Sequence, residues 1–236
     1  MRQRLELGCA ALCLALLTVT ADAEPLEPYT ATYLARGSGL KAELVVSLSK
    51  NGDGSWTYRT STSGKGLAAL VGSPTETSVF GLIDGAIVPR EYRLDDGSDR
   101  RNRDSQFLFD WQSYRAHGTY ESETRDLKIK PGVLDRHAYL VELSRDAFAG
   151  TIPESYDVVS GGAIKTYHIT VEGDETITTK DAGSFKTLKL SQQREGSSRT
   201  TYYWLAKDLR YLPVRMEQYR KGKRKSRADL VSVDGL

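Results

Sequence analysis

Apolar residues recur at every second position in several stretches of this chain, most clearly in residues 44–48, 107–111 and 167–171. A period of two sends successive side chains to opposite faces, so each stretch predicts a strand with one buried face. Turn residues such as Asn51-Gly52-Asp53-Gly54 and Asp84-Gly85 separate such stretches. These turns favour hairpins, so the chain is expected to be mainly a meander of antiparallel strands. The predicted strands include residues 40–50, 56–61, 77–83, 87–94, 175–179, 185–193, 200–205, 214–219 and 228–233.

Residues 133–149 follow helical spacing instead. The apolar side of this predicted helix contains Val133, Leu134, His137, Leu140, Val141, Ser144 and Phe148. The opposite side contains Asp135, Glu142 and Asp146. A lone amphipathic helix among strands must cover a sheet, so we expect it to fill the concave side of a curved sheet. A movable lid over a ligand cavity is the alternative. This assignment of residues to the two sides of the helix predicts that Leu140→Asp destabilises the fold and that Glu142→Ala has little effect.

The first 23 residues are typical of a secretory signal peptide. A short cationic start precedes an apolar run at residues 7–19, and Ala21-Asp22-Ala23 forms a small-x-small cleavage site. The run is shorter than a membrane span, and neither cysteine in it stands in a lipidation motif. We therefore expect cleavage after Ala23 and a soluble periplasmic product. That product, residues 24–236, is expected to be a single β-rich domain without cysteine and without a transmembrane segment.

The signatures of common catalytic and metal sites are missing from the sequence. The three histidines, His117, His137 and His168, show no metal-ligand spacing, and His137 is interpreted as a core residue. There is no GxSxG motif for a nucleophilic serine. The acidic residues of 95–104 do not match a calcium-binding loop and suggest a solvated loop. We therefore expect no catalytic residue, no cofactor and no metal. The net charge of +2 gives no global reason to bind nucleic acid.

The strongest local charge is a basic cluster at the last predicted hairpin. The cluster contains Arg220, Lys221, Lys223, Arg224, Lys225 and Arg227, with Gly222 at the turn. The simpler interpretation is a solvated hairpin tip that also protects an edge strand from aggregation. The alternative is a surface that binds an anionic envelope component. Either way, this hairpin is the best-motivated surface for a partner.

Large apolar residues of the helix and of the C-terminal strands form a second candidate site. Most of them should be ordinary sheet packing. A subset is a candidate for lining a cavity that takes an acyl chain or another amphiphile. The candidate ligand-binding residues are Leu140, Val141, Phe148, Tyr203 and Trp204.

A set of short motifs spread along the chain resembles a known family. In order they are residues 29–33 (YTATY), 87–92 (IVPREY), 109–111 (FDW), 183–190 (GSFKTLKL), 203–208 (YWLAKD) and 211–215 (YLPVR). Together they resemble the bacterial exported family catalogued as domain of unknown function 3108, over nearly all of residues 24–236. The resemblance implies a β-rich periplasmic or envelope-associated protein. It implies no reaction and no catalytic residues.

These observations predict an all-β fold. The expected architecture is a strongly curved antiparallel sheet or incomplete barrel, with one amphipathic helix packed on its concave face. Two β subdomains flanking the helix are the alternative. The predicted function is a non-enzymatic periplasmic binding or carrier protein for an amphiphilic or hydrophobic envelope component. The alternatives are an envelope scaffold or protein-interaction module that uses the basic hairpin and, third, a hydrolase with unrecognised carboxylates.

Overall fold

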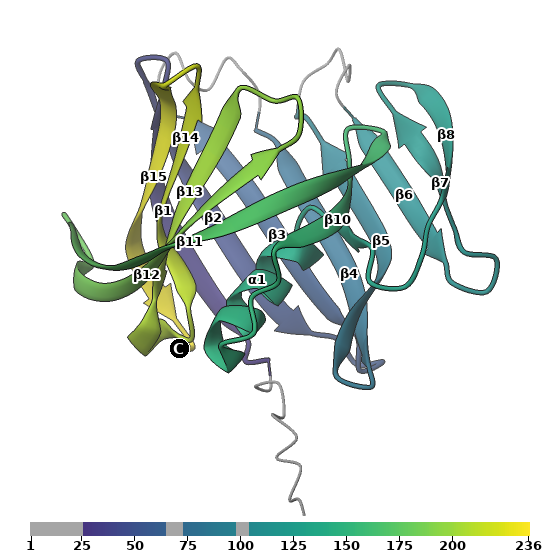
Figure 1. Ribbon diagram of the computed structural model, residues 1–236, viewed down its shortest axis with the longest axis horizontal. Coiled ribbons are helices and arrows are strands. Elements are labelled where there is room, and N and C mark those ends of the chain that lie inside the picture. The colour runs from purple at the N-terminus through teal and green to yellow at the C-terminus, as the bar shows by residue number, and fades with distance from the viewer. Residues whose placement is uncertain (1–25, 65–72, 98–103) are drawn as a thin grey trace, which may run out of the picture.

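The computed structural model describes residues 26–64, 73–97 and 104–236. Within them, fifteen strands form a single sheet that curls into an open barrel, with one α-helix on its concave side (Figure 1). The predicted fold class is therefore confirmed. The predicted signal peptide, residues 1–23, lies outside the described residues. The strands are β1 (Tyr29–Gly37), β2 (Leu40–Lys50), β3 (Trp56–Gly64), β4 (Thr75–Ile83), β5 (Ala86–Asp95), β6 (Ser105–Asp110), β7 (Arg115–Tyr120), β8 (Glu123–Lys128), β9 (Leu134–Asp135), β10 (Ser155–Ser160), β11 (Ala163–Thr179), β12 (Gly183–Arg194), β13 (Arg199–Ala206), β14 (Leu212–Arg220) and β15 (Lys223–Asp234); the helix is α1 (Ala138–Ala149), and a 3₁₀ turn, η2 (Lys207–Leu209), follows β13.

The sheet is two meanders joined at the ends of the chain. Strands follow one another from β8 to β1 on one side and from β15 to β9 on the other. β1 pairs with β15 from Thr30↔Asp234 to Gly37↔Ser226, and this antiparallel pair unites the two halves. Every neighbouring pair is antiparallel except β9 and β10, which are parallel. β8 and β9 are the outer strands of the described sheet, so the barrel stays open.

Period-two burial confirms the strand pattern that the sequence predicts. In β6, Phe107 and Phe109 are buried, and Leu108 between them is 53% exposed. β2 has the predicted bounds and buries Val46 and Leu48 on one face. The faces buried in this way form a large core between the sheet and α1, and a smaller one under β5, β6 and β10.

The helix begins five residues later than the helical spacing predicts. Leu134 and Asp135 form the short strand β9, which pairs with Val158 and Val159 of β10. The Asp135 carboxylate then accepts hydrogen bonds from the backbone N–H groups of His137 and Ala138 at 2.8 and 2.9 Å. Asp135 therefore stabilises the start of the helix from inside the core, where it is 0% exposed. The prediction that Asp135 lies on the polar side of the helix is wrong, because Asp135 precedes the helix.

The helix is covered on more sides than an amphipathic pattern indicates. Its innermost residues are Tyr139, Leu143 and Ala147, which are spaced four apart and almost fully buried. By contrast, Phe148, predicted on the apolar side, is 46% exposed. The curled sheet encloses the helix, so even its polar side meets protein. No helix in the described part of the chain has the length and apolar character needed to cross a membrane.

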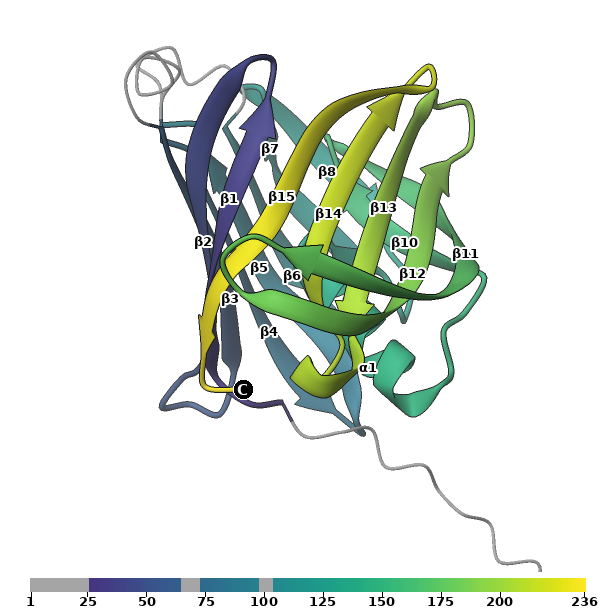
Figure 2. The ribbon, with the colours of Figure 1, turned by 90° about the vertical axis from the view of Figure 1, so that its left-hand side faces the viewer.

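The last residues of β11 and the first residues of β12 form a long arm that lies across the outer face of β13–β15 (Figure 2). A register shift at Gly173 marks where β11 turns onto this path. The arm buries Ile177 and Phe185. The Arg215 guanidinium of β14 donates to the Thr178 carbonyl of the arm at 2.9 Å. The arm thus gives this part of the sheet a second buried face, on the side opposite the helix.

Candidate functional site

A cavity of about 560 Å³ lies between α1 and the two halves of the sheet. One wall comes from β4, β5 and the β7–β8 turn, and the other from β11–β14. The segment between β9 and α1 forms its floor, with Arg136 and His137. This volume is in the range of small-molecule binding sites. The fold therefore supplies a concave site where the predicted helix meets the sheet.

A network of polar side chains occupies the floor of this cavity. The Arg136 guanidinium lies 3.2 Å from the Glu76 carboxylate, and the Tyr92 hydroxyl donates to the same carboxylate at 2.6 Å. Burial acts to raise the pKa of Glu76, but the charge of Arg136 and the hydrogen bond from Tyr92 oppose it, and that pKa lies below its ordinary value. Glu76 is therefore ionised and held by partners.

His137 is the most enclosed titratable group of the floor. Its Nε2 lies 3.3 Å from the Thr60 hydroxyl and 3.6 Å from the Glu76 carboxylate, and its ring packs 4.9 Å from that of Tyr58. Burial lowers the pKa of His137 to about 4, because the low-dielectric interior disfavours the imidazolium. The imidazole is therefore neutral at pH 7. This placement agrees with its interpretation as a core histidine.

Asp135 lies beneath this floor and does not line the cavity. Its carboxylate accepts the Ser78 hydroxyl at 2.6 Å in addition to the two helix N–H groups. Complete burial raises the pKa of Asp135 to about 6, although these hydrogen bonds oppose the shift. The Asp135 carboxylate, with its raised pKa, is therefore separated from the cavity and holds the start of the helix.

Tyrosine rings line much of the cavity. The Tyr139 ring of α1 packs edge-on against Tyr167 with the ring centroids 5.3 Å apart, and Tyr203 and Tyr92 line the opposite walls. Leu140 adds an aliphatic surface. Tyrosine presents an apolar ring and a polar hydroxyl, so this lining suits a ligand with both apolar and polar parts.

Three cationic side chains stand together on the β11–β13 wall. Lys165 comes from β11, Arg194 from the end of β12, and Arg199 from the start of β13. None of them makes an ion pair or a side-chain hydrogen bond with another described residue. Burial and the nearby positive charges of Arg194, Arg136 and Arg199 lower the pKa of Lys165. This wall therefore has a positive potential that no carboxylate of the described structure neutralises.

The five predicted ligand-binding residues occupy four different places. Leu140 and Tyr203 line the cavity. Val141 lines a separate apolar pocket of about 50 Å³ beside Leu48 and Leu212. Phe148 lies at the surface with its ring edge-on to Tyr211. Trp204 follows Tyr203 in β13 and so faces the outer side, where it donates to Glu175 of the arm at 3.0 Å. Only Leu140 and Tyr203 are brought together.

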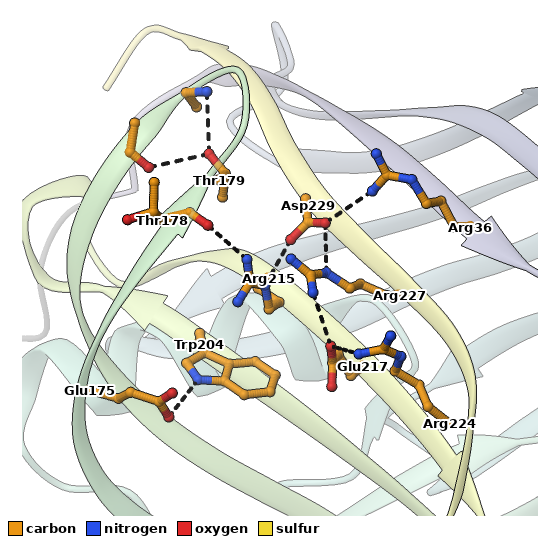
Figure 3. A network of polar contacts seen from close by, with 12 residues as sticks. Arg36, Glu175, Thr178, Thr179, Trp204, Arg215, Glu217, Arg224, Arg227 and Asp229 are labelled. Carbon is orange, nitrogen blue, oxygen red and sulfur yellow. Dashed lines mark hydrogen bonds and ion pairs between the residues drawn. The ribbon is translucent and has the colours of Figure 1, made fainter.

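The basic hairpin is divided into a paired base and an unpaired tip. Arg224 and Arg227 lie near the buried carboxylate of Glu217, at 2.8 and 3.7 Å, and Arg227 also binds Asp229 (Figure 3). The remaining members form no ion pair with another described residue. These exposed tip cations are Arg220, Lys221, Lys223 and Lys225. Arg224 and Arg227 therefore stabilise the fold through ion pairs, and the tip cations are available to bind a partner.

Among the described residues, one acidic group has the spacing of a metal site. Carboxylate oxygens of Asp95, Asp96 and Asp104 lie within 4.8 Å of one another. Asp104 accepts a hydrogen bond from the Asp96 backbone N–H at 2.9 Å, so the group is held by protein contacts. Asp99, which the sequence places in the same acidic stretch, lies outside the described residues. The expectation that the protein binds no metal stays a prediction.

Comparison with known proteins places the chain in a family. The family described as protein of unknown function DUF3108 matches residues 28–227, so the chain belongs to it. A beta-barrel-like protein of domain of unknown function DUF1849 from Brucella abortus has a similar fold, with a TM-score of 0.58, 12% identity, and coverage of 89% of this chain and 98% of that one. The MucA/MucB complex of Pseudomonas aeruginosa gives a TM-score of 0.36, at 12% identity over 91% of this chain and 53% of that one. No curated protein matches the chain.

Proposed function

We propose that this member of the DUF3108 family is a non-enzymatic binding or carrier protein of the periplasm, and that it holds an amphiphilic envelope component in the central cavity. The observation that carries the proposal is the cavity of about 560 Å³ between α1 and the curled sheet. The cavity is open to solvent and is lined by both polar and apolar side chains, as clefts that bind small molecules are. The space is therefore interpreted as room for a ligand.

The lining favours an amphiphile over a purely apolar ligand. Tyr139, Tyr203 and Leu140 supply apolar surface, and Arg136 and Lys165 supply charge within the same cavity. The apolar pocket beside Val141 holds only about 50 Å³, close to the space of one or two water molecules. A long acyl chain cannot be housed there. The ligand is therefore expected to place a polar group among the cavity cations and an apolar part against the tyrosines.

The titratable groups of the cavity support binding rather than hydrolysis. A general base needs a pKa near the working pH and free access to the substrate. Glu76 is ionised and held by Arg136 and Tyr92, whereas Asp135 has the raised pKa but does not reach the cavity. This separation argues against the hydrolase alternative.

The proposal is tested by native mass spectrometry of the protein purified from the periplasm of its own host. The expected spectrum contains a protein mass that begins at Glu24, after removal of residues 1–23, and a second species heavier by the mass of one bound lipid or other amphiphile. A membrane-retained protein with residues 1–23 still attached would contradict the proposed location. A mature protein without any bound amphiphile would contradict the carrier function.

The tip cations support a second candidate function, attachment to an anionic envelope surface. Four exposed cations without acidic partners repel one another, and binding to an anionic surface would offset this repulsion. Replacing Arg220, Lys221, Lys223 and Lys225 with serine is expected to abolish weak binding to phosphatidylglycerol vesicles and to leave the melting temperature unchanged. The wild-type binding should weaken steeply with salt.

Arg224 is left in place in this variant because its removal would leave the buried Glu217 carboxylate with a more distant partner. Vesicle co-sedimentation at low and at high salt measures the effect. Equal binding by the wild type and the quadruple variant would show that the hairpin is only a solvated tip.

A further inference from the structure

Three cations on adjacent strands face the same cavity, and the register of the strands explains why. Arg194 pairs with Tyr167 across β12 and β11, and Lys165 lies two residues from Tyr167 on the same face. The pair Gln193↔Thr200 aligns β12 with β13 and sets Arg199 beside Arg194. Neighbouring strands are about 5 Å apart, so the three side chains leave the sheet as close neighbours. They form the cation cluster of the cavity: Lys165, Arg194 and Arg199.

The carboxylates of the cavity do not neutralise this cluster. Glu76, Asp96 and Glu121 belong to the opposite wall, from β4, the residue after β5 and the β7–β8 turn. Glu76 already binds Arg136 and Tyr92. The charges that act on Lys165 are those of Arg194, Arg136 and Arg199, all positive. The cavity is therefore polarised, with an unneutralised positive wall.

Cationic side chains that stabilise the outer face of this fold are paired with carboxylates. Arg215 and Arg227 both bind the Asp229 carboxylate at 2.7 Å, and Arg224 binds Glu217 (Figure 3). The members of the cation cluster have no such partners in the described residues. Like charges held together without counter-charges destabilise a fold, so an external anion is the natural counter-charge for this wall.

From this arrangement we infer that Lys165, Arg194 and Arg199 bind an oxyanion, a phosphate or carboxylate group carried by the ligand. The inference rests on the proposed function and specifies the polar group of the amphiphile. Two arginines offer planar guanidinium groups that match an oxyanion in a bidentate way, and the lysine adds a third donor. The apolar part of the ligand then extends along Tyr167, Tyr203 and Leu140.

The test compares two amphiphiles that share one chain, dodecyl phosphate and dodecylphosphocholine, with inorganic phosphate as the third probe. Isothermal titration calorimetry is done with each amphiphile at concentrations where it is monomeric. The variant carries Lys165→Gln, Arg194→Gln and Arg199→Gln. The control carries Lys41→Gln, Lys128→Gln and Lys186→Gln, the same change of charge at exposed positions outside the cavity.

The wild type and the control are expected to bind dodecyl phosphate more tightly than dodecylphosphocholine. The cavity variant should lose roughly 100-fold in affinity for dodecyl phosphate, since it loses three charge-assisted contacts. Its melting temperature should be unchanged or higher, because removing like charges relieves repulsion. If the triple variant does not fold, Lys165→Gln alone should still weaken binding about tenfold.

The outcomes separate this inference from the proposed function. Equal affinity for the two amphiphiles, or an unchanged affinity in the cavity variant, would overturn the oxyanion site and leave amphiphile binding intact. Binding of inorganic phosphate as tight as that of dodecyl phosphate, lost in the cavity variant, would support the oxyanion site and overturn the amphiphile. No binding of any probe by the wild type would overturn both.

Discussion

Leu143→Asp is expected to leave the protein unfolded at room temperature. Leu143 is 1% exposed in the middle of α1, and the sheet surrounds it. An aspartate there would bury a charge without a partner, which costs more than the few kcal/mol that single substitutions typically cost. The milder Leu143→Ala should lower the free energy of unfolding by about 2–5 kcal/mol, through lost contacts and the resulting cavity.

The matched control is Phe148→Ala on the same helix. Phe148 is 46% exposed and makes a ring contact with Tyr211, so its truncation should cost less than about 1 kcal/mol. Urea denaturation followed by circular dichroism measures both variants. Similar losses at Leu143 and Phe148 would mean that the helix is not seated in the sheet as described.

The structure also changes what is expected of the two substitutions suggested by the helical spacing. Leu140 lines the cavity, so an aspartate at this position reaches water and its cost is reduced. Glu142 lies 2.6 Å from Arg145, whose side chain is only 8% exposed. Glu142→Ala would remove the only carboxylate paired with that buried guanidinium among the described residues, and is therefore expected to be more harmful than the spacing predicts.

The second large effect concerns pH and the neighbouring residues Asp135 and His137. The pKa of Asp135 in the folded protein, about 6, is above its unfolded value of about 3.9, so its contribution to stability falls as pH rises from about 4 to 6. The pKa of His137, about 4, is below its unfolded value of about 6.5, so its contribution rises over a similar range. The two contributions oppose each other and nearly cancel in the wild type.

Single substitutions should expose each contribution separately. Relative to the wild type, His137→Gln is expected to lose stability as pH rises from 4 to 7, by about 2–3 kcal/mol. Asp135→Asn keeps an oxygen acceptor for the helix N–H groups and is expected to gain stability by a similar amount over the same range. Urea denaturation at pH 4, 5, 6 and 7 measures both slopes. Parallel pH profiles for the two variants would contradict the burial of these groups.

The strands could be predicted from the sequence because their signal is local. Alternating burial and a turn after each strand are enough to locate β2, with the bounds that the structure shows. The start of the helix could not be located in this way. Leu134 and Asp135 fit the helical spacing, but β10, more than twenty residues later, pairs with them and holds them in a strand. Contacts between distant segments outweighed the local pattern.

The candidate site was only partly predictable, for a related reason. Tyr203 and Trp204 are neighbours in sequence, and the period of a strand alone implies that they face opposite sides. Which side faces the cavity depends on where α1 lies. Lys165, Arg194 and Arg199 gave no local signal, since they come together only through the register of three strands. They could have been found by looking for cationic residues that fall on the same face of neighbouring predicted strands.

If the cavity holds an amphiphile, a large side chain that fills the cavity should displace it. Thr201 lines the cavity from β13, and Thr200 beside it faces the outer side of the same strand. We would purify the Thr201→Trp and Thr200→Trp proteins from the host periplasm and measure each by native mass spectrometry. The two variants carry the same substitution, one on the cavity face of β13 and one on its outer face. We expect that Thr200→Trp retains the bound amphiphile and that Thr201→Trp loses it while remaining folded. Retention of the amphiphile by both variants would show that it is not bound in this cavity.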